Sequence, residues 1–449
     1  MTKVTLALMS LLVMAGLLCT QADAAFNVFP GTSWQTRTPE EVGLKSSQLA
    51  DFALRVGGSG TVVRDGYLVY AWGDQAKSYD WYSASKPVMS TLLFMGINEG
   101  RVPSVDTKIK DIAGFPYALQ GEDQNITFRH LADMTSGYAL DDAPGATFSY
   151  NDFAIDLYAK TLDLAVFPGE DTTYGLINEA NTRLRDPLHF QDGVIFGNNS
   201  NVQRPGLRVK CTVRDFSRVG WLWMNKGRWG NEQLIPQSFF DNYCKADVPS
   251  SVAVSSDTTA DDYLPVYSYG GGANQSAEGP GIYGFNWWFN TSYEGTGPLT
   301  WPSAPADTFQ ANGRWGADVM TMFPSLGMVV AADGNWGETV RGSSSCNMNN
   351  SLAILTGAAM HSGDANGDGS VGMGDLDAIA KNWGLSGKVW SEGDFNHDGT
   401  INVGDLGVLA GNWGWATSTG SVPEPASLSL LALAVLGSMV RGKRRRGAR

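Results

Sequence analysis

Ser83 and Lys86 are the residues of this sequence whose types and spacing best support chemistry. They form a Ser-x-x-Lys motif, and no other lysine of the chain has a serine three residues before it. Helix positions three apart share a face, so the lysine can reach the serine hydroxyl. That hydroxyl is a good nucleophile only when a neighbouring base takes its proton. The motif predicts nucleophilic catalysis by Ser83 with Lys86 as its activating base; a capped surface helix is the alternative.

A Ser-His-Asp triad is the competing chemistry. Before residue 360 the sequence contains only two histidines, His130 and His189. His130 belongs to a short helical stretch and is expected to be structural. No Gly-x-Ser-x-Gly nucleophile elbow is present. The sequence therefore favours a lysine-assisted serine.

Short strands and helices must position this pair. Residues 61–70 read as two strands joined by the tight turn Asp65-Gly66, a strong hairpin signal. Helices are expected at 92–98, ended by Gly100, and at 212–225, stopped by Gly227.

Several stretches, in their order along the chain, resemble the serine β-lactamase and penicillin-binding-protein superfamily. The likeness is greatest to its esterase and 6-aminohexanoate-dimer-hydrolase-like members. It covers about residues 35–355, and its main stretches are 126–137, 212–220, 229–236 and 283–288. The resemblance implies an α/β (α+β) fold of β-lactamase type, with an antiparallel sheet flanked by helices, a helical lobe and the site between them. It also implies acylation of Ser83 by an ester or amide, then hydrolysis.

The family's Tyr-x-Asn motif matches residues 144–152 of this sequence. Tyr150 then corresponds to the catalytic tyrosine, which is expected to shuttle a proton between Ser83 and the leaving group. Asp152 stands where the family has asparagine. A carboxylate there is expected to favour the protonated form of Lys86 and so to hinder proton transfer.

The family's third motif, Lys-Thr-Gly or His-x-Gly, has only a degenerate counterpart here. Its best register is 311–313, followed by Arg314. The resemblance implies an oxyanion hole built from the backbone N–H groups of Ser83 and Arg314. Asn312, Gly313 and Arg314 are the expected oxyanion or substrate residues.

An internal repeat near the C-terminus carries acidic loops. Its two copies place oxygen-bearing side chains at positions 1, 3, 5 and 12 of an EF-hand-type loop, with glycine at position 6. The predicted calcium ligands are Asp364, Asn366, Asp368 and Asp375 in the first copy, and Asp394, Asn396, Asp398, Asn402 and Asp405 in the second. The pair resembles a dockerin, a small all-α module, whose partner would be a cohesin-like protein. An unmetallated pair of acidic turns is the alternative.

Both ends of the chain carry targeting signals. Lys3, an apolar run and an Ala-x-Ala site predict a signal peptide over residues 1–24, with a membrane anchor as the alternative. The Pro-Glu-Pro sequence at 423–425, an apolar run and terminal arginines resemble a PEP-CTERM sorting signal, with a simple anchor as the alternative. The resemblance implies a sorting protease and an envelope or extracellular location, with transient anchoring through a transmembrane tail.

Composition sets the remaining limits. The 449 residues are 43% hydrophobic, enough for a large core, and the net charge of −13 argues against nucleic-acid binding. Beyond the leader, Cys211, Cys244 and Cys346 allow one disulfide, for which we predict Cys211–Cys244. The expected domains are a hydrolase over 25–360, a calcium module over 361–416 and a sorting tail over 417–449.

Three functions fit these observations. The leading one is an exported serine hydrolase that cleaves a small ester or amide, without a catalytic cofactor. A true β-lactamase or D-Ala-D-Ala carboxypeptidase is the second. The third is a non-catalytic binding protein on the same fold, an option kept open by Asp152 and the degenerate third motif.

Overall fold

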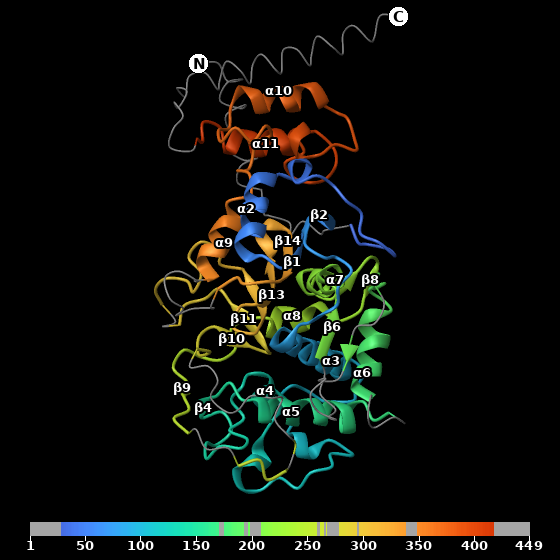
Figure 1. Cartoon of the computed structure of the whole chain (residues 1–449), viewed down its shortest axis with the longest axis vertical. Coiled ribbons are helices and arrows are strands. Elements are labelled where there is room, and N and C mark those ends of the chain that lie inside the picture. Colours follow the sequence, from blue (N-terminus) through green and yellow to red (C-terminus); the bar gives the residue numbers. More distant parts are fainter. Residues whose placement is uncertain are drawn as a thin grey trace, which may run out of the picture. The chain divides into compact units, whose positions relative to one another are not determined.

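The described chain forms two compact units. The computed structural model describes residues 28–169, 175–192, 196–197, 208–257, 261–264, 266, 278–293, 296–337 and 348–416. The larger unit spans Ala25–Pro39 and Ser46–Ala358, whereas the smaller one combines Glu40–Lys45 with residues from Ala359 onward. The chain therefore contributes to the smaller unit twice (Figure 1).

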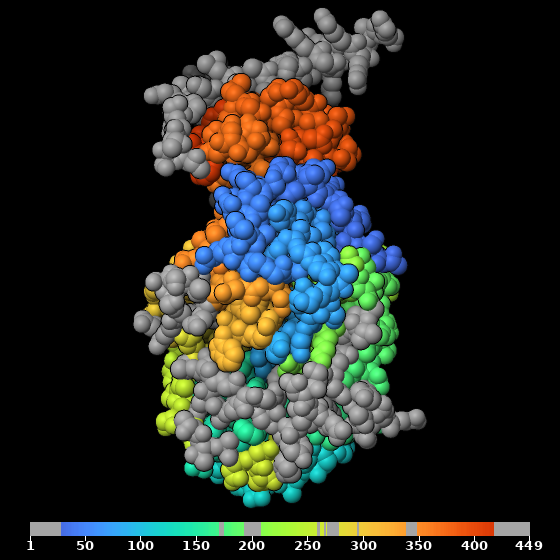
Figure 2. Space-filling view, in the orientation of Figure 1, coloured from blue at the N-terminus to red at the C-terminus, as the bar shows by residue number. Residues whose placement is uncertain are grey.

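A seven-stranded antiparallel sheet is the frame of the larger unit. Its strand order is β10-β11-β12-β13-β14-β1-β2, so the first strand of the chain pairs with the last. In Figure 2, residues near 60–70 (blue) accordingly lie beside residues near 320–330 (orange). The strands are β1 (Ser59–Arg64), β2 (Tyr67–Trp72), β10 (Tyr283–Gly284), β11 (Trp287–Phe289), β12 (Phe309–Gly313), β13 (Asp318–Phe323) and β14 (Met328–Asp333).

Helices make up the rest of the larger unit. Helices α3 to α6, with two π-helical turns, contact one another and form the helical lobe. The helices are α2 (Ser46–Val56), α3 (Lys86–Asn98), α4 (Phe128–Ala132), α5 (Asp152–Thr161), α6 (Gly175–Ala180), α7 (Val213–Met224), α8 (Gln237–Tyr243) and α9 (Met348–Thr356). The sheet, its helices and this lobe confirm the predicted fold class.

Short elements connect these parts. A three-stranded sheet has the order β3 (Tyr79–Asp80), β6 (Arg208–Cys211) and β5 (Phe196–Gly197). Two strand pairs are β4 (Thr147–Phe148) with β9 (Ala253–Val254), and β7 (Arg228–Trp229) with β8 (Glu232–Gln233). Single helical turns are η2 (Tyr82–Ser85), η3 (Ile109–Asp111), η4 (Gly121–Asn125), η5 (Leu162–Val166), η6 (Asn181–Arg185) and η7 (Pro324–Leu326).

Helices α7 and α2 cover opposite faces of the sheet (Figure 1). On the α7 face, Thr61 Oγ1 and Ser217 Oγ are hydrogen-bonded at 2.7 Å. Successive strand residues point to opposite faces. Gly60 precedes Thr61 and therefore faces the opposite side of the sheet. Trp72, which pairs with Gly60 across the two strands, faces that same opposite side. There it meets the ring of Phe52 from α2, at 5.8 Å between centroids.

The local signals of the sequence are confirmed. Asp65 and Gly66 join β1 and β2 with positive φ angles of 52° and 86°, as a type I′ hairpin turn requires. Thr212 caps α7, since its hydroxyl accepts the Asp215 N–H at 3.3 Å. Helix α3 ends before Gly100, whose φ is 74°.

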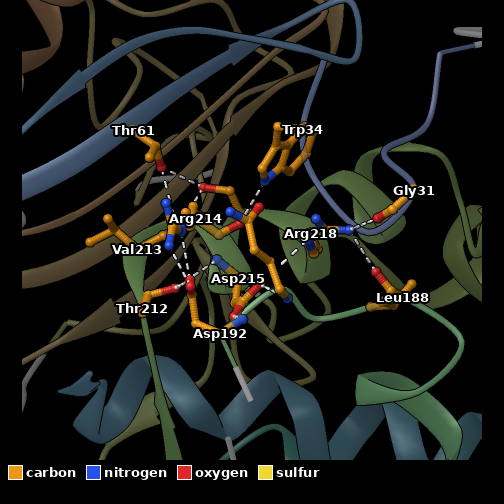
Figure 3. Close-up of polar contacts among 12 residues, drawn as sticks. Gly31, Trp34, Thr61, Leu188, Asp192, Thr212, Val213, Arg214, Asp215 and Arg218 are labelled. Atoms are coloured by element: carbon orange, nitrogen blue, oxygen red, sulfur yellow. Dashed lines mark hydrogen bonds and ion pairs between the residues drawn. The ribbon is translucent and has the colours of Figure 1, made fainter. Parts of the chain in front are cut away.

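A buried charge network joins α7 to two other segments (Figure 3). Arg218 is fully buried, and its Nη1 donates to the carbonyl oxygens of Gly31 at 2.8 Å and Leu188 at 2.9 Å. Its Nε lies 3.4 Å from Asp215 Oδ1. Burial lowers the pKa of Arg218 to about 10. The Asp215 carboxylate therefore provides the counter-charge for this guanidinium.

We expect Arg218→Met to lower the free energy of unfolding by about 3 kcal/mol, because it leaves Asp215 buried without its counter-charge. Arg185→Met is the control. Arg185 pairs with the more exposed Asp186, and such surface pairs contribute about 1 kcal/mol or less. Urea unfolding of both variants measures the difference. Equal losses would show that the buried pair contributes no more than a surface pair.

The smaller unit contains two acidic loops, each followed by a helix. Its elements are η1 (Glu40–Val42), α10 (Met373–Asn382), η8 (Trp390–Glu392) and α11 (Val403–Gly411). Its apolar core consists of Ala365, Val371, Leu376, Ile379, Trp390, Phe395, Ile401 and Leu409. Both helices therefore bury a face against residues that belong to the loops.

The predicted disulfide is wrong. Cys211 and Cys244 are free thiols, because Cys211 ends β6 inside the protein while Cys244 follows α8. Burial raises the pKa of both thiols, which disfavours the reactive thiolate. Cys346 and the segments 1–24 and 417–449 lie outside the described residues. Within the described ranges, no helix is long and apolar enough to cross a membrane.

Candidate active site

Ser83 lies in the short turn η2, which leads directly into α3. Two hydrogen bonds shape this turn: Tyr82 N–H donates to Asp80 Oδ1 at 3.0 Å, and Ala84 N–H donates to the Trp81 carbonyl at 2.9 Å. Tyr82 has a left-handed backbone with φ 46°, which is uncommon for a bulky residue. Strain of this kind clusters at functional sites.

Strand β6 fixes the turn from the outside. Val209 N–H donates to Ser85 Oγ at 2.9 Å, and the Val209 carbonyl accepts from Trp81 N–H at 3.0 Å. Arg208 makes two hydrogen bonds to the Asp80 carboxylate, at 2.8 and 3.0 Å. The position of the serine is thus determined by contacts on both sides of it.

Lys86 begins α3, and its ammonium reaches the serine. Lys86 Nζ donates to Ser83 Oγ at 2.8 Å. In a 3₁₀ turn residues three apart eclipse each other, so η2 brings the two side chains together. Lys86 is 1% exposed whereas Ser83 is half-buried. The base is therefore shielded from water while the hydroxyl remains open to a substrate.

Asp152 also faces the lysine. Its Oδ1 lies 3.3 Å from Lys86 Nζ, and both side chains are buried. Asp152 is placed by the start of α5, where the neighbouring Asn151 caps the helix through the Phe153 N–H at 2.9 Å. The residue that departs from the family motif is therefore the ion-pair partner of Lys86.

We expect Asp152→Asn to move the rising limb of the pH–rate profile to lower pH. The carboxylate favours the protonated ammonium of Lys86, so its removal lets the lysine lose its proton more easily. Asp186→Asn, in a surface ion pair, is the control. Profiles of kcat/KM against pH measure the shift, and an unmoved limb would show that Asp152 does not set the protonation of Lys86.

Tyr150 contacts the same lysine through its ring. Lys86 Nζ lies 5.1 Å from the ring centroid, and the ring stacks on Trp288 at 6.0 Å. Tyr150 is buried. The structure thus places Tyr150 beside Lys86, next to the predicted nucleophile.

If Tyr150 moves a proton in the reaction, Tyr150→Phe should lower kcat by about 10²–10⁴-fold, the usual worth of a positioned proton transfer. The ring and its contact with Lys86 are kept in this variant. Tyr67→Phe, on the outer strand β2, is the matched loss of a hydroxyl and should leave kcat within about twofold. Steady-state kinetics of both variants decides, and a near-normal Tyr150→Phe would remove Tyr150 from the mechanism.

Gly313 brings the end of β12 against the turn that carries Ser83. A Cβ atom there would lie 2.6 Å from the Trp81 carbonyl oxygen and 3.1 Å from the Ala84 nitrogen. Only glycine permits this approach. The end of β12 is therefore in direct contact with the turn that carries the nucleophile.

The side chains around Gly313 hold the β12–β13 turn. Asn312 Oδ1 accepts the Gly316 N–H at 3.1 Å. Arg314 is ion-paired with Asp318 and, at 2.9 Å, with Asp333. Burial raises the pKa of Asp318 to about 7. The structure thus brings Gly313 to the turn that carries the serine, while Asn312 holds the β12–β13 turn and Arg314 pairs with carboxylates of β13 and β14.

Comparison with known proteins agrees with this arrangement. Residues 47–178, which include the serine, lysine and tyrosine, match the Beta-lactamase family. The chain has a β-lactamase-like fold. Residues 421–446 match the PEP-CTERM protein-sorting motif, which indicates export to the cell envelope and lies in the undescribed tail. No curated protein matches the sequence.

Solved structures resemble the β-lactamase-like unit at low identity. A β-lactamase from Mycobacterium bovis is 17% identical, covers 70% of this chain and 100% of its own, and has a TM-score of 0.45. A penicillin-binding protein homologue from Caulobacter crescentus is 13% identical, covers 72% of this chain and 97% of its own, and has a TM-score of 0.47. A β-lactamase/D-alanine carboxypeptidase from Yersinia pestis is also 13% identical, covers 70% of this chain and 98% of its own, and has a TM-score of 0.47.

The histidines of the β-lactamase-like unit are engaged elsewhere. His130 Nδ1 accepts the Thr127 N–H at 3.2 Å in a helix-capping arrangement, and burial lowers its pKa. His189 ends a turn with φ 52°. Within the described ranges, neither histidine is hydrogen-bonded to Ser83, so the geometry gives no support to a Ser-His-Asp triad.

Sequence reasoning missed two residues of the site, Asp80 and Tyr82. Tyr82 is partly exposed next to the nucleophile, and its ring lies between the guanidinium groups of Arg208 at 4.4 Å and Arg314 at 5.0 Å. An aspartate two residues before a chain reversal is a recognisable Asx-turn signal. The contacts of Arg208 and Arg314 with Tyr82 join segments that are far apart in the sequence, so no local pattern reveals them.

The acidic loops of the smaller unit have matching geometry. At position 1, Asp364 and Asp394 each accept a glycine N–H through Oδ2, from Gly369 at 3.1 Å and Gly399 at 3.0 Å. Their Oδ1 atoms are buried and have no hydrogen-bond partner among the described residues. Burial raises the pKa of both carboxyls, that of Asp394 to about 6.

The position-12 residues close each loop. Asp375 accepts the Ala365 N–H and Asp405 accepts the Phe395 N–H, both at 2.8 Å. Asn366 and Asn396, at position 3, accept the N–H groups of Asp368 and Asp398 at 2.8 and 3.0 Å. Among the described residues, no group of three or more His, Cys, Asp or Glu side chains is arranged so that it could bind a metal ion without other ligands. A cation here would also need amide, backbone or water oxygens, as calcium commonly does.

Proposed function

We propose that the chain is an exported serine hydrolase that cleaves a small ester or amide through an acyl-enzyme on Ser83. The observation that carries the proposal is the 2.8 Å hydrogen bond between the buried ammonium of Lys86 and the half-buried hydroxyl of Ser83. A binding protein has no need of a buried lysine aimed at an accessible serine. The match of this segment to the Beta-lactamase family supports the same reaction class.

The chemistry runs in two steps. In its neutral form Lys86 Nζ takes the proton as Ser83 Oγ bonds to the substrate carbonyl carbon. Backbone N–H groups of Ser83 and Arg314 would stabilise the oxyanion beside Gly313. The leaving group departs with a proton delivered by Lys86 or Tyr150. Water then attacks the acyl carbon and gives a proton to Lys86 or Tyr150, and this proton passes to Ser83 Oγ as the acyl bond breaks.

A turnover screen separates this function from its rivals. Purified protein is given a series of nitrophenyl esters of increasing acyl length and, in parallel, a chromogenic cephalosporin. We expect ester hydrolysis to have the higher kcat/KM. Faster turnover of the cephalosporin would instead identify a β-lactamase or carboxypeptidase. Absence of turnover together with absence of active-serine labelling would identify a binding protein.

We also propose that each acidic loop binds Ca²⁺. The supporting observation is the pair of buried, unpartnered Oδ1 atoms of Asp364 and Asp394, both at position 1. Asn366, Asp368 and Asp375 complete the first set; Asn396, Asp398, Asn402 and Asp405 complete the second. The cation would neutralise carboxylates that otherwise repel one another. Calorimetric titration of the whole protein with Ca²⁺ tests this, and absence of binding heat would refute it.

The dockerin resemblance makes a cohesin-like protein the proposed partner of this module. For the tail, we propose cleavage near the Pro-Glu-Pro sequence by a membrane protease, which releases or transfers the hydrolase at the envelope. Mass spectrometry of the protein recovered from cells tests the latter, because an intact terminal arginine segment would contradict cleavage.

A further inference from the structure

Glu40–Lys45 belongs to the smaller unit although it lies more than 300 residues before the loops. Gly43 is its central contact. A Cβ atom on Gly43 would lie 2.7 and 2.9 Å from the Cδ2 and Cε2 atoms of Trp390, so the backbone rests directly on the indole. Gly43 also has φ +71°, a conformation that side-chain-bearing residues rarely adopt. Glycine is thus required here for two independent reasons.

Two further contacts fix the segment. The Gly43 carbonyl accepts the Met360 N–H at 2.7 Å, and Leu44 forms an antiparallel bridge with Ala359. Leu44 is fully buried. Both contacts join the backbones of the two chain segments. They lie immediately before the first acidic loop.

Trp390 connects the segment to both loops. Its Nε1 donates to the Asp364 carbonyl at 2.9 Å, which is position 1 of the first loop. Its ring packs against Phe395 at 5.2 Å and His397 at 5.3 Å, both in the second loop. Trp390 is 4% exposed. One buried side chain therefore touches Gly43, the first loop and the second loop.

We propose that Glu40–Lys45 is a built-in partner of the acidic-loop module, so that calcium occupancy of the loops and the order of this N-terminal segment are coupled. The proposal rests on the calcium binding proposed above and is independent of the hydrolase reaction. Ordering of the loops fixes the position of the Trp390 side chain, and the Gly43 backbone packs against its indole ring.

Hydrogen exchange on the whole mature protein, with Ca²⁺ or with chelator, tests the coupling. We expect Ca²⁺ to slow exchange in two regions, the loops and residues 40–45. Gly43→Ala should abolish the slowing at 40–45 and weaken Ca²⁺ binding by about tenfold, within the usual range for coupled sites. Gly57→Ala is the matched control. Gly57 has φ +68°, yet nothing lies within 4 Å of its Cβ position, so it bears the same backbone strain without the clash.

The outcomes are distinct. Ca²⁺ binding without slower exchange at 40–45 overturns the coupling and leaves the calcium sites intact. Equal Ca²⁺ affinities of Gly43→Ala and Gly57→Ala also overturn it. Absence of Ca²⁺ binding by the wild-type protein overturns the calcium proposal itself. Far-ultraviolet circular dichroism and thermal unfolding report that each variant is folded, so a global folding failure cannot pass for loss of coupling.

Discussion

Replacing Ser83 with alanine should reduce ester turnover by about 10⁴-fold or more, the usual consequence of deleting an acylated nucleophile. The fold should persist, because Ser83 is half-buried and, within the described residues, its side chain is hydrogen-bonded to Lys86. Ser78→Ala is the control, since Ser78 is an exposed serine five residues earlier. Steady-state rates with a nitrophenyl ester measure both.

Retention of more than about one hundredth of the wild-type rate by Ser83→Ala would mean that another group forms the acyl-enzyme. Thermal unfolding of the same samples shows whether a loss of rate reflects chemistry. A melting temperature equal to that of Ser78→Ala assigns the loss to the missing hydroxyl.

Lys86→Met has the second-largest expected effect. It removes the only base placed on Ser83 Oγ in the described part of the chain, and should lower kcat/KM by about 10²–10⁴-fold. It also leaves Asp152 buried without its partner, and breaking a buried pair in this way costs about 3–5 kcal/mol. A single variant would therefore confuse loss of folding with loss of chemistry.

The double variant Lys86→Met with Asp152→Asn separates these effects. It exchanges the ion pair for a neutral pair of similar volume, which usually restores most of the stability. We expect its unfolding free energy to approach that of the wild type while its turnover stays as low as that of Lys86→Met. Recovery of turnover in the double variant would contradict a role for Lys86 as base.

Local patterns predicted the parts of this fold that local interactions determine. The Asp65-Gly66 turn and the Thr212 cap depend on residues within a few positions of one another, and both occur as expected. The sheet order could be predicted only through the family resemblance. The inclusion of Glu40–Lys45 in the smaller unit could not, because it depends on the contact of Gly43 with Trp390, far along the chain.

The site shows the same division. Ser83 and Lys86 were recognisable because one turn of helix joins them. Asp152 was singled out by its departure from a motif, and only the structure shows its carboxylate 3.3 Å from Lys86 Nζ. Tyr150 was assigned the role of a proton shuttle from the motif alone, and the structure shows its ring centroid 5.1 Å from Lys86 Nζ. The Cys211–Cys244 pairing failed because spacing along the chain carries no information on distance in space.

Covalent labelling tests the central claim most directly. The intact protein is treated with a fluorophosphonate, digested, and the modified residue is located by mass spectrometry. Activation of Ser83 by Lys86 predicts a single adduct on Ser83, abolished in Ser83→Ala and strongly slowed in the stabilised Lys86→Met/Asp152→Asn variant. An adduct on a different serine, or labelling at the wild-type rate in the lysine variant, would contradict it.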